Sequence, residues 1–112
     1  MSDKAVNTRL CGMLGFAMRA GKLLIGTELI CNGMAKRDAG GIKLVVISSS
    51  ASDNTKKKLM TKSEFYSIKA VTVNIDTDRL GALLGKSYAP AAVAVCDEGF
   101  AKEILKSVDE NK

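Results

Sequence analysis

The feature that most constrains the fold of this chain is a regular alternation between short apolar runs and longer amphipathic segments. The apolar runs lie at residues 23–25, 42–47, 70–75 and 91–96. Short apolar runs bounded by turn residues are typical of strands, whereas apolar residues that recur every three or four positions are typical of helices. The sequence therefore predicts five helices and four strands in strict alternation, beginning and ending with a helix.

The amphipathic segments predict where the helices lie and which side chains they bury. Helices are expected at 4–19, 28–36 and 77–84, with two more after Ser50 and Asp97. Apolar residues at helical spacing face the core of a protein. The residues expected to face inward are Val6, Leu10, Met13, Leu14, Ala17, Leu29, Ile30, Met34, Leu59, Met60, Phe65, Phe100, Ile104, Leu105 and Val108.

Several helix ends are marked by residues with a defined capping role. Gly21 and Gly85 follow two of the expected helices, where glycine takes the left-handed conformation that ends a helix. Asp76 precedes the fourth helix, and its carboxylate can accept hydrogen bonds from the first free amides. For the third helix, Ser50 with Asp53 three residues later fits a capping box. These signals predict the helix boundaries independently of the apolar pattern.

Alternation of this kind predicts an α/β fold, specifically a three-layer α/β/α sandwich around a central, mostly four-stranded mixed sheet. The 112 residues suit one domain, 1–112, because single cores typically contain roughly 100–150 residues. No segment approaches the ~20 apolar residues of a membrane span, and the N-terminal residues lack the apolar core of a signal peptide. We therefore expect a cytoplasmic protein that does not associate with membranes.

The absence of histidine excludes the commonest catalytic arrangements. Ser-His-Asp catalysis, Cys-His catalysis and His-bound zinc all require that residue. The three cysteines, Cys11, Cys31 and Cys96, include no CxxC motif, and free cysteines in a reducing compartment are usually buried. We expect no enzyme activity, no metal and no cofactor. The alternative of a thiol enzyme requires a cysteine whose pKa is lowered by a nearby cation or helix start.

One loop with polar groups suited to nucleic acid is Gly26-Thr27-Glu28, at the expected turn from the first strand into the second helix. The start of a helix offers free amides and a partial positive charge, both of which suit phosphate. Gly26 allows close approach of the backbone, and Thr27 and Glu28 project polar groups from the first turn. The alternative is that Thr27 only caps the helix.

A second loop of this kind precedes the last strand and contains Lys86, Ser87 and Tyr88. A cation, a hydroxyl and an aromatic ring together can contact phosphate and stack on a base. The alternative is an ordinary helix-to-strand connection stiffened by Pro90.

The charge of the chain favours a polyanionic partner. Seventeen Lys and Arg residues against twelve Asp and Glu give a formal net charge of +5, and such an excess on a small protein favours nucleic acid. Lys22 and Lys36 are candidates for phosphate contacts beside Lys86. The lysines at 56–58 either contribute to binding or form a solvated helix face. Aromatic residues make up only 4% of the chain, so a broad stacking platform for single strands is not expected.

The sequence also contains five distinctive blocks, at residues 14–23, 26–28, 43–47, 53–58 and 93–101. Taken together they resemble the bacterial YlxQ-like members of the kink-turn-binding ribosomal protein family, which includes large-subunit proteins seven-Ae and thirty-e. The resemblance covers about residues 10–105. It implies an α/β/α sandwich that binds RNA, typically a kink-turn, a sharply bent internal loop with tandem sheared G·A pairs.

The resemblance also implies roles for individual residues. In the family, an Asn-Glu turn at the start of the second helix reads guanine edges, and these two positions fall on Thr27 and Glu28. A family lysine that contacts phosphate one helical turn later falls on Cys31. The family loop that clasps an extruded base falls on residues 86–88. The sequence departs from the family pattern at Thr27 and Cys31.

These observations lead to one main expectation and one alternative. We expect a monomeric, non-catalytic protein that binds structured RNA, with ribosomal RNA among the candidate partners. The expected contacts are Lys22, Gly26, Thr27, Glu28, Lys36, Lys86, Ser87 and Tyr88. The alternative, suggested by the two departures, is a protein-interaction module that kept the fold and lost specific RNA recognition.

Overall fold

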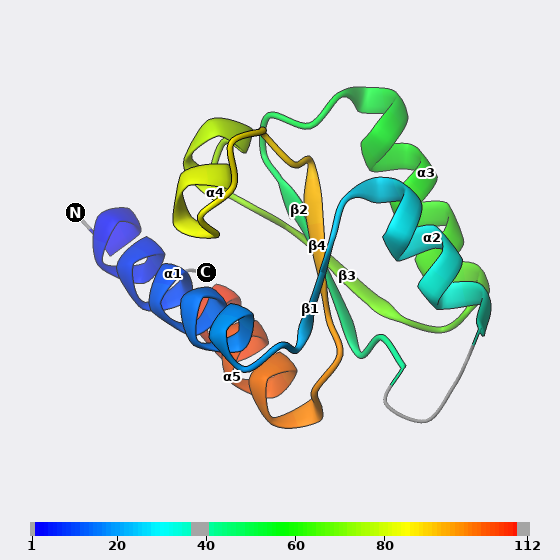
Figure 1. Ribbon diagram of the computed structural model, residues 1–112, viewed down its shortest axis with the longest axis horizontal. Coiled ribbons are helices and arrows are strands. Elements are labelled where there is room, and N and C mark those ends of the chain that lie inside the picture. Colours follow the sequence, from blue (N-terminus) through cyan, green and yellow to red (C-terminus); the bar gives the residue numbers. More distant parts are fainter. Residues whose placement is uncertain (1, 37–40, 110–112) are drawn as a thin grey trace.

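The computed structural model describes the backbone of residues 2–36 and 41–109 and the side chains of residues 9–35 and 41–108. Helices and strands alternate in the predicted order (Figure 1). Their bounds are α1 Ser2–Arg19, β1 Leu23–Ile25, α2 Thr27–Lys36, β2 Leu44–Ser48, α3 Asp53–Phe65, β3 Lys69–Val73, α4 Thr77–Leu83, β4 Ala92–Val95 and α5 Glu98–Asp109. Among the described helices, none is both long and apolar enough to cross a membrane.

The four strands form one mixed sheet in the order β1-β4-β2-β3. β4 is antiparallel to both of its neighbours, with Leu23 and Leu44 each opposite Val95. β2 and β3 are parallel and start together, with Leu44 opposite Lys69. A parallel pair needs a crossover connection, which α3 provides. The predicted mixed sheet is therefore confirmed, and the direction of β1 is settled by its pairing with β4.

Helices cover both faces of the sheet, which confirms the three-layer sandwich. Residues of α1, α4 and α5 pack with one face of the strands in one apolar cluster, and residues of α2 and α3 pack with the other face in a second cluster (Figure 1). All five residues of β2 are buried, as predicted for a strand covered on both sides. The loops that connect these elements therefore gather at the two ends of the sheet.

The helical period identified most of the core correctly. The predicted inward residues that are fully buried are Leu10, Leu14, Ala17, Ile30, Met34, Leu59 and Ile104. Those that are partly buried against the core are Met13, Phe100, Leu105 and Val108. The side chain of Val6 lies outside the described residues.

Three predicted inward residues are instead exposed. Leu29 is 55% exposed, Met60 46% and Phe65 78%. Each of the first two directly adjoins a buried residue, Ile30 or Leu59, and successive helical residues point about 100° apart. One turn of either helix buries only one of the two neighbours. Phe65 is the last residue of α3, where its ring meets the ring of Tyr66 edge-on, with ring centroids 4.9 Å apart.

The helix ends follow the predicted glycine and aspartate signals with one exception. Gly21 and Gly85 have φ angles of +72° and +70° after α1 and α4. Asp76 accepts a hydrogen bond from the Arg79 amide at 2.7 Å, and Asp97 caps α5 in the same way.

The capping box predicted at Ser50 is wrong. α3 begins two residues later than predicted, and Ser52 accepts the hydrogen bond from the Thr55 amide. The Ser50 hydroxyl oxygen instead accepts a hydrogen bond from the Thr77 amide at 2.9 Å, at the start of α4. A contact between residues 27 positions apart therefore decided the role of this serine.

Candidate nucleic-acid interface

The two polar loops singled out in the sequence lie next to each other at one end of the sheet. The Gly26 amide donates a hydrogen bond to the Ala92 carbonyl at 3.2 Å, and the Ser48 amide donates to the Ala91 carbonyl at 2.8 Å. We call residues 26–28, 48–52 and 86–91 the loop edge (Figure 1). Because Tyr88 precedes Ala92 by four residues, the chain between them spans at most roughly 14 Å.

Gly26, not Thr27, is the residue that caps α2. Its carbonyl accepts the first helical hydrogen bond, from the Ile30 amide at 3.0 Å, and its φ of +108° lies in the region that favours glycine. The alternative that Thr27 serves only as a cap is therefore wrong. Within the described part of the chain, the Thr27 hydroxyl and the exposed Glu28 carboxylate have no hydrogen-bond partner. Both groups can meet a ligand.

The loop that contains Lys86 is held tightly against α4. The Lys86 amide donates to the Gly81 carbonyl at 2.9 Å and the Gly85 amide to the Ala82 carbonyl at 3.1 Å, which together form a Schellman motif. The Tyr88 carbonyl packs directly on Gly81, where a side chain would find no space. The backbone of the loop is therefore fixed, as the alternative of a stiffened connection requires.

The side chains of this fixed loop nevertheless face outward. Tyr88 is 53% exposed, Ser87 is exposed and Lys86 is half-buried, whereas Pro90 is buried. A rigid backbone that presents a cation, a hydroxyl and an exposed ring offers contacts at low entropic cost to binding.

Two serines that sequence reasoning did not assign to the site join its neighbouring loops. The Ser48 hydroxyl donates to the Ile75 carbonyl at 2.6 Å, and Ser50 accepts from the Thr77 amide. These bonds tie the end of β2 to the turn before α4, and α4 in turn supports the Lys86 loop. The run of three serines at 48–50 was the visible signal, but its partners could be found only in three dimensions.

The remaining predicted lysines lie elsewhere. Lys22 is at the opposite end of β1, where its carbonyl accepts a hydrogen bond from the Cys96 amide at 2.8 Å. Lys36 is the last residue of α2, roughly 14 Å along the helix axis from Thr27, and its side chain lies outside the described residues. The structure thus groups Lys86 with residues 26–28 and separates Lys22 and Lys36 from them.

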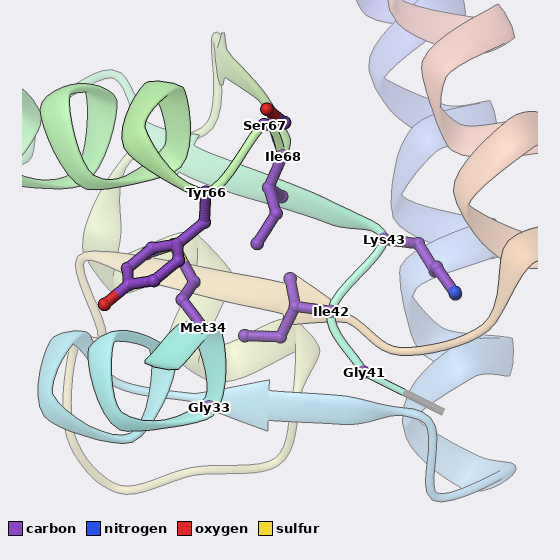
Figure 2. A pocket seen from close by; sticks show the side chains of 8 residues that line it. All are labelled: Gly33, Met34, Gly41, Ile42, Lys43, Tyr66, Ser67 and Ile68. Carbon is purple, nitrogen blue, oxygen red and sulfur yellow. The ribbon is translucent and has the colours of Figure 1, made fainter. Parts of the chain in front are cut away.

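The hollow in Figure 2, about 360 Å³ in volume, also lies away from the loop edge. Gly33 and Met34 of α2, residues 41–43 and the turn after α3 form its walls. Lys43, Tyr66 and Ser67 are among its lining residues, and the hollow is not part of the candidate interface.

The environments of Cys11 and Cys96 do not favour a reactive thiolate. All three are partly rather than fully buried, which corrects the expectation of full burial. Burial raises the pKa of the Cys11 and Cys96 thiols, and this effect outweighs the opposing influence of Arg79 on Cys11 and of Lys22 on Cys96. A raised pKa disfavours the reactive thiolate. Among the described residues, no three Cys, Asp or Glu side chains gather to hold a metal ion.

The order of elements and the mixed four-stranded sheet define an α/β/α sandwich. Comparison with known sequences identifies the family within this fold class. The sequence profile of the ribosomal protein L7Ae/L30e/S12e/Gadd45 family matches residues 8–105. The chain belongs to this family.

Individual relatives cover nearly the whole chain. The RNA-binding protein YlxQ of Enterococcus faecium is 34% identical over 108 residues, which is 96% of this chain and 93% of that protein. YlxQ of Bacillus subtilis (strain 168) is 35% identical over 97 residues, 87% of this chain and 92% of that protein. Large ribosomal subunit protein eL30 of Sulfolobus acidocaldarius is 32% identical over 101 residues, 90% of this chain and 93% of that protein.

Solved structures support the same fold. A Bacillus halodurans protein of unknown function superposes with a TM-score of 0.80 at 33% identity, over 90% of this chain and 97% of that one. A 15.5 kD RNA binding protein of Giardia lamblia superposes with a TM-score of 0.74, over 95% of this chain and 87% of that one. The identity to the second is only 14%, so that similarity concerns the fold alone.

Proposed function

We propose that this protein binds structured RNA of the kink-turn type at its loop edge, without catalysis. The observation that carries the proposal is the juxtaposition of residues 26–28 with the loop at 86–88. The two segments are 60 positions apart in the sequence, and each was a candidate on its own chemistry. Relatives named RNA-binding protein YlxQ, which match nearly the whole chain, support RNA as the ligand, as does the net charge of +5.

The chemistry of each group suggests its role in the complex. The Glu28 carboxylate accepts hydrogen bonds from guanine amino groups, and the free amides at the start of α2 lie beside a phosphate. Lys86 contacts the phosphate backbone, and the exposed ring of Tyr88 stacks on an unpaired base. Base contacts at Glu28 would specify the RNA, whereas the contact at Lys86 would mainly position it.

A second candidate function is a protein-interaction module. Two observations favour it. Cys31, at the position where the family pattern has a lysine, is partly buried against the core and carries no charge. Leu29, beside Glu28, is 55% exposed, and an exposed apolar side chain suits a protein partner.

A comparison of two RNAs separates these functions. Fluorescence anisotropy would measure the affinity for a kink-turn RNA and for a plain duplex of equal length. We expect tighter binding of the kink-turn. The logarithm of the affinity falls with the logarithm of the salt concentration, at a slope of about −1 for each phosphate that a lysine such as Lys86 neutralises. Weak and equal binding of both RNAs would contradict the proposal and favour the interaction module.

Two substitutions test the assigned residues. Lys86→Ala weakens binding of both RNAs and reduces the salt slope by about one. Glu28→Ala lowers the preference for the kink-turn on the order of tenfold, since a good base contact contributes about 1–3 kcal/mol of discrimination. Lys106→Ala and Glu103→Ala, both on α5 and outside the residues of the loop edge, are the matched charge controls. If the variants at 28 and 86 bind like the parent, the loop edge is not the binding site.

A further inference from the structure

A second basic surface lies at the end of the sheet opposite the loop edge. Lys43, Lys69 and Lys102 line a hollow of about 420 Å³, and Glu98 is the one carboxylate in its described lining. Lys22 lies at the same end of the sheet, at the start of β1. We call the four lysines, 22, 43, 69 and 102, the lysine cluster.

The strand register brings these lysines together. Lys69 starts β3 beside Leu44 of β2, and the Lys43 amide donates to the Val95 carbonyl of β4 at 2.8 Å. The Lys22 carbonyl accepts from the Cys96 amide at the end of β4. Neighbouring strands are about 4.8 Å apart, so the backbones of Lys22 and Lys69, on the two edge strands, are separated by about 14 Å. This width matches a short stretch of nucleic-acid backbone.

The ammonium groups of the cluster are available to a ligand. All four lysines are exposed. Figure 2 shows the Lys43 side chain directed away from the neighbouring hollow and toward the face of the sheet that α1 and α5 cover. Within the described part of the chain, none of the four forms an ion pair. Unpaired like charges in one region repel one another, and a bound polyanion would relieve this repulsion.

The surroundings of the cluster favour the backbone of an RNA duplex over other partners. Among the residues whose side chains the structure describes, the large exposed apolar ones are Phe16, Leu29, Met60, Phe65 and Tyr88. None of them lines the hollow, and the ring of Phe16, which precedes Lys22 in the chain, has the Arg19 guanidinium 5.0 Å above it. Protein interfaces rely on buried aromatic anchors, and single-stranded RNA needs rings on which bases stack. A duplex needs neither, because proteins recognise it by shape and by contacts to phosphate.

We propose that the lysine cluster is a second RNA site, which holds the phosphate backbone of a duplex segment while the loop edge holds the kink-turn. This proposal rests on the proposed function for the identity of the polyanion. Because the two surfaces are at opposite ends of the same strands, one molecule would bridge two helical segments of a folded RNA. The cluster would not discriminate between base sequences, because it offers cations but no group positioned to contact base edges.

The test is an NMR titration of the ¹⁵N-labelled protein with a 20-base-pair RNA duplex. The duplex is added both to the free protein and to protein saturated with kink-turn RNA. In the saturated protein we expect amide shifts at Lys22, Lys43, Lys69 and along 98–102. With four phosphate contacts, raising the salt from 50 to 200 mM lowers duplex affinity about 150-fold. In the double variant K69Q/K102Q the loss falls to about 12-fold, because two contacts, Lys22 and Lys43, are left.

Two glutamate variants provide a control in which a negative charge, rather than a positive one, is removed. Glu98→Gln removes the carboxylate from the hollow and should raise duplex affinity. Glu64→Gln, an exposed residue on α3, changes the net charge equally and should leave that affinity near the parent value. Equal effects of the two variants would mean that net charge alone governs binding, and would overturn the proposal.

Two other outcomes would also overturn it. The first is a duplex that shifts only residues 26–28 and 86–88 of the free protein and none in the saturated protein. The second is a set of shifts at the cluster that appears with anionic lipid vesicles and not with the duplex. If the kink-turn RNA fails to bind, the proposed function fails, while the duplex titration of the free protein still tests the cluster.

Discussion

Gly81 lies where the Lys86 loop meets α4, and Gly81→Ala is the most direct test of how that loop is supported. A Cβ at this position would overlap the Tyr88 carbonyl oxygen and would lie 3.2 Å from Cδ of Pro90. Backbone and a proline ring cannot move aside as the tip of a flexible side chain can. The loop must therefore shift outward, on the order of an ångström.

The energetic effect combines two opposing terms. Overpacking a close-packed site costs about 1–3 kcal/mol, whereas replacing glycine by alanine within a helix contributes about 0.5–1 kcal/mol of stability. The net destabilisation is about 0–2.5 kcal/mol. A change of 1 kcal/mol moves the melting temperature of a domain of this size by about 4 °C, so we expect a decrease of up to about 10 °C, in contrast to the increase at an open helical site.

Gly12→Ala is the matched control. Gly12 is an exposed position in α1, and a Cβ there would have no heavy atom within 4 Å. The helical term then acts alone, and the melting temperature should rise by about 2–4 °C. Circular dichroism melts of both variants give the comparison, and anisotropy with kink-turn RNA gives the effect on binding. We expect weaker RNA binding only in Gly81→Ala. If both alanines raise the melting temperature alike, the claim that the loop rests on Gly81 is refuted.

Two further predictions concern regions outside the loop edge. Ser67, in the turn after α3, has a φ of +58°; Ser67→Gly should therefore stabilise the fold by about 0.5–1 kcal/mol in urea unfolding, and no gain relative to Ser67→Ala would contradict this. Cys11 and Cys96 have raised pKa values, so native alkylation at neutral pH should be slow compared with the unfolded chain. Because the unfolded thiols ionise first as the pH rises, their contribution to stability is lost above the ordinary thiol pKa. Fast alkylation of the native protein would contradict the raised pKa values. A free energy of unfolding that does not decrease as the pH rises through the titration of these thiols would contradict them too.

The order of helices and strands could be predicted because it depends on local properties of the sequence. Apolar periodicity, the glycines at 21 and 85 and the aspartates at 76 and 97 act within a few residues of their own position. The prediction that Leu29 faces inward was wrong because it, too, used only the local sequence. A period shows which residues share a helix face, but the neighbouring layer decides how wide the buried part of that face is. The assignment of Ser50 failed because its partner, Thr77, is distant in sequence.

The candidate site combines predictable and unpredictable parts. The chemistry of Glu28 and Lys86 can be read from local sequence, but their proximity depends on β1 running antiparallel to β4, which three residues of strand do not reveal. Lys22 shows that residues close in sequence can be far apart in the fold. It precedes β1 and Gly26 follows it, so the strand holds the two about 13 Å apart, at opposite ends of the sheet. The lysine cluster thus lies at the end of the sheet opposite Glu28 and Lys86. A protein with polar groups at one end of its sheet and a group of lysines at the other is better suited to hold two segments of one folded polyanion than to bind a single site more tightly.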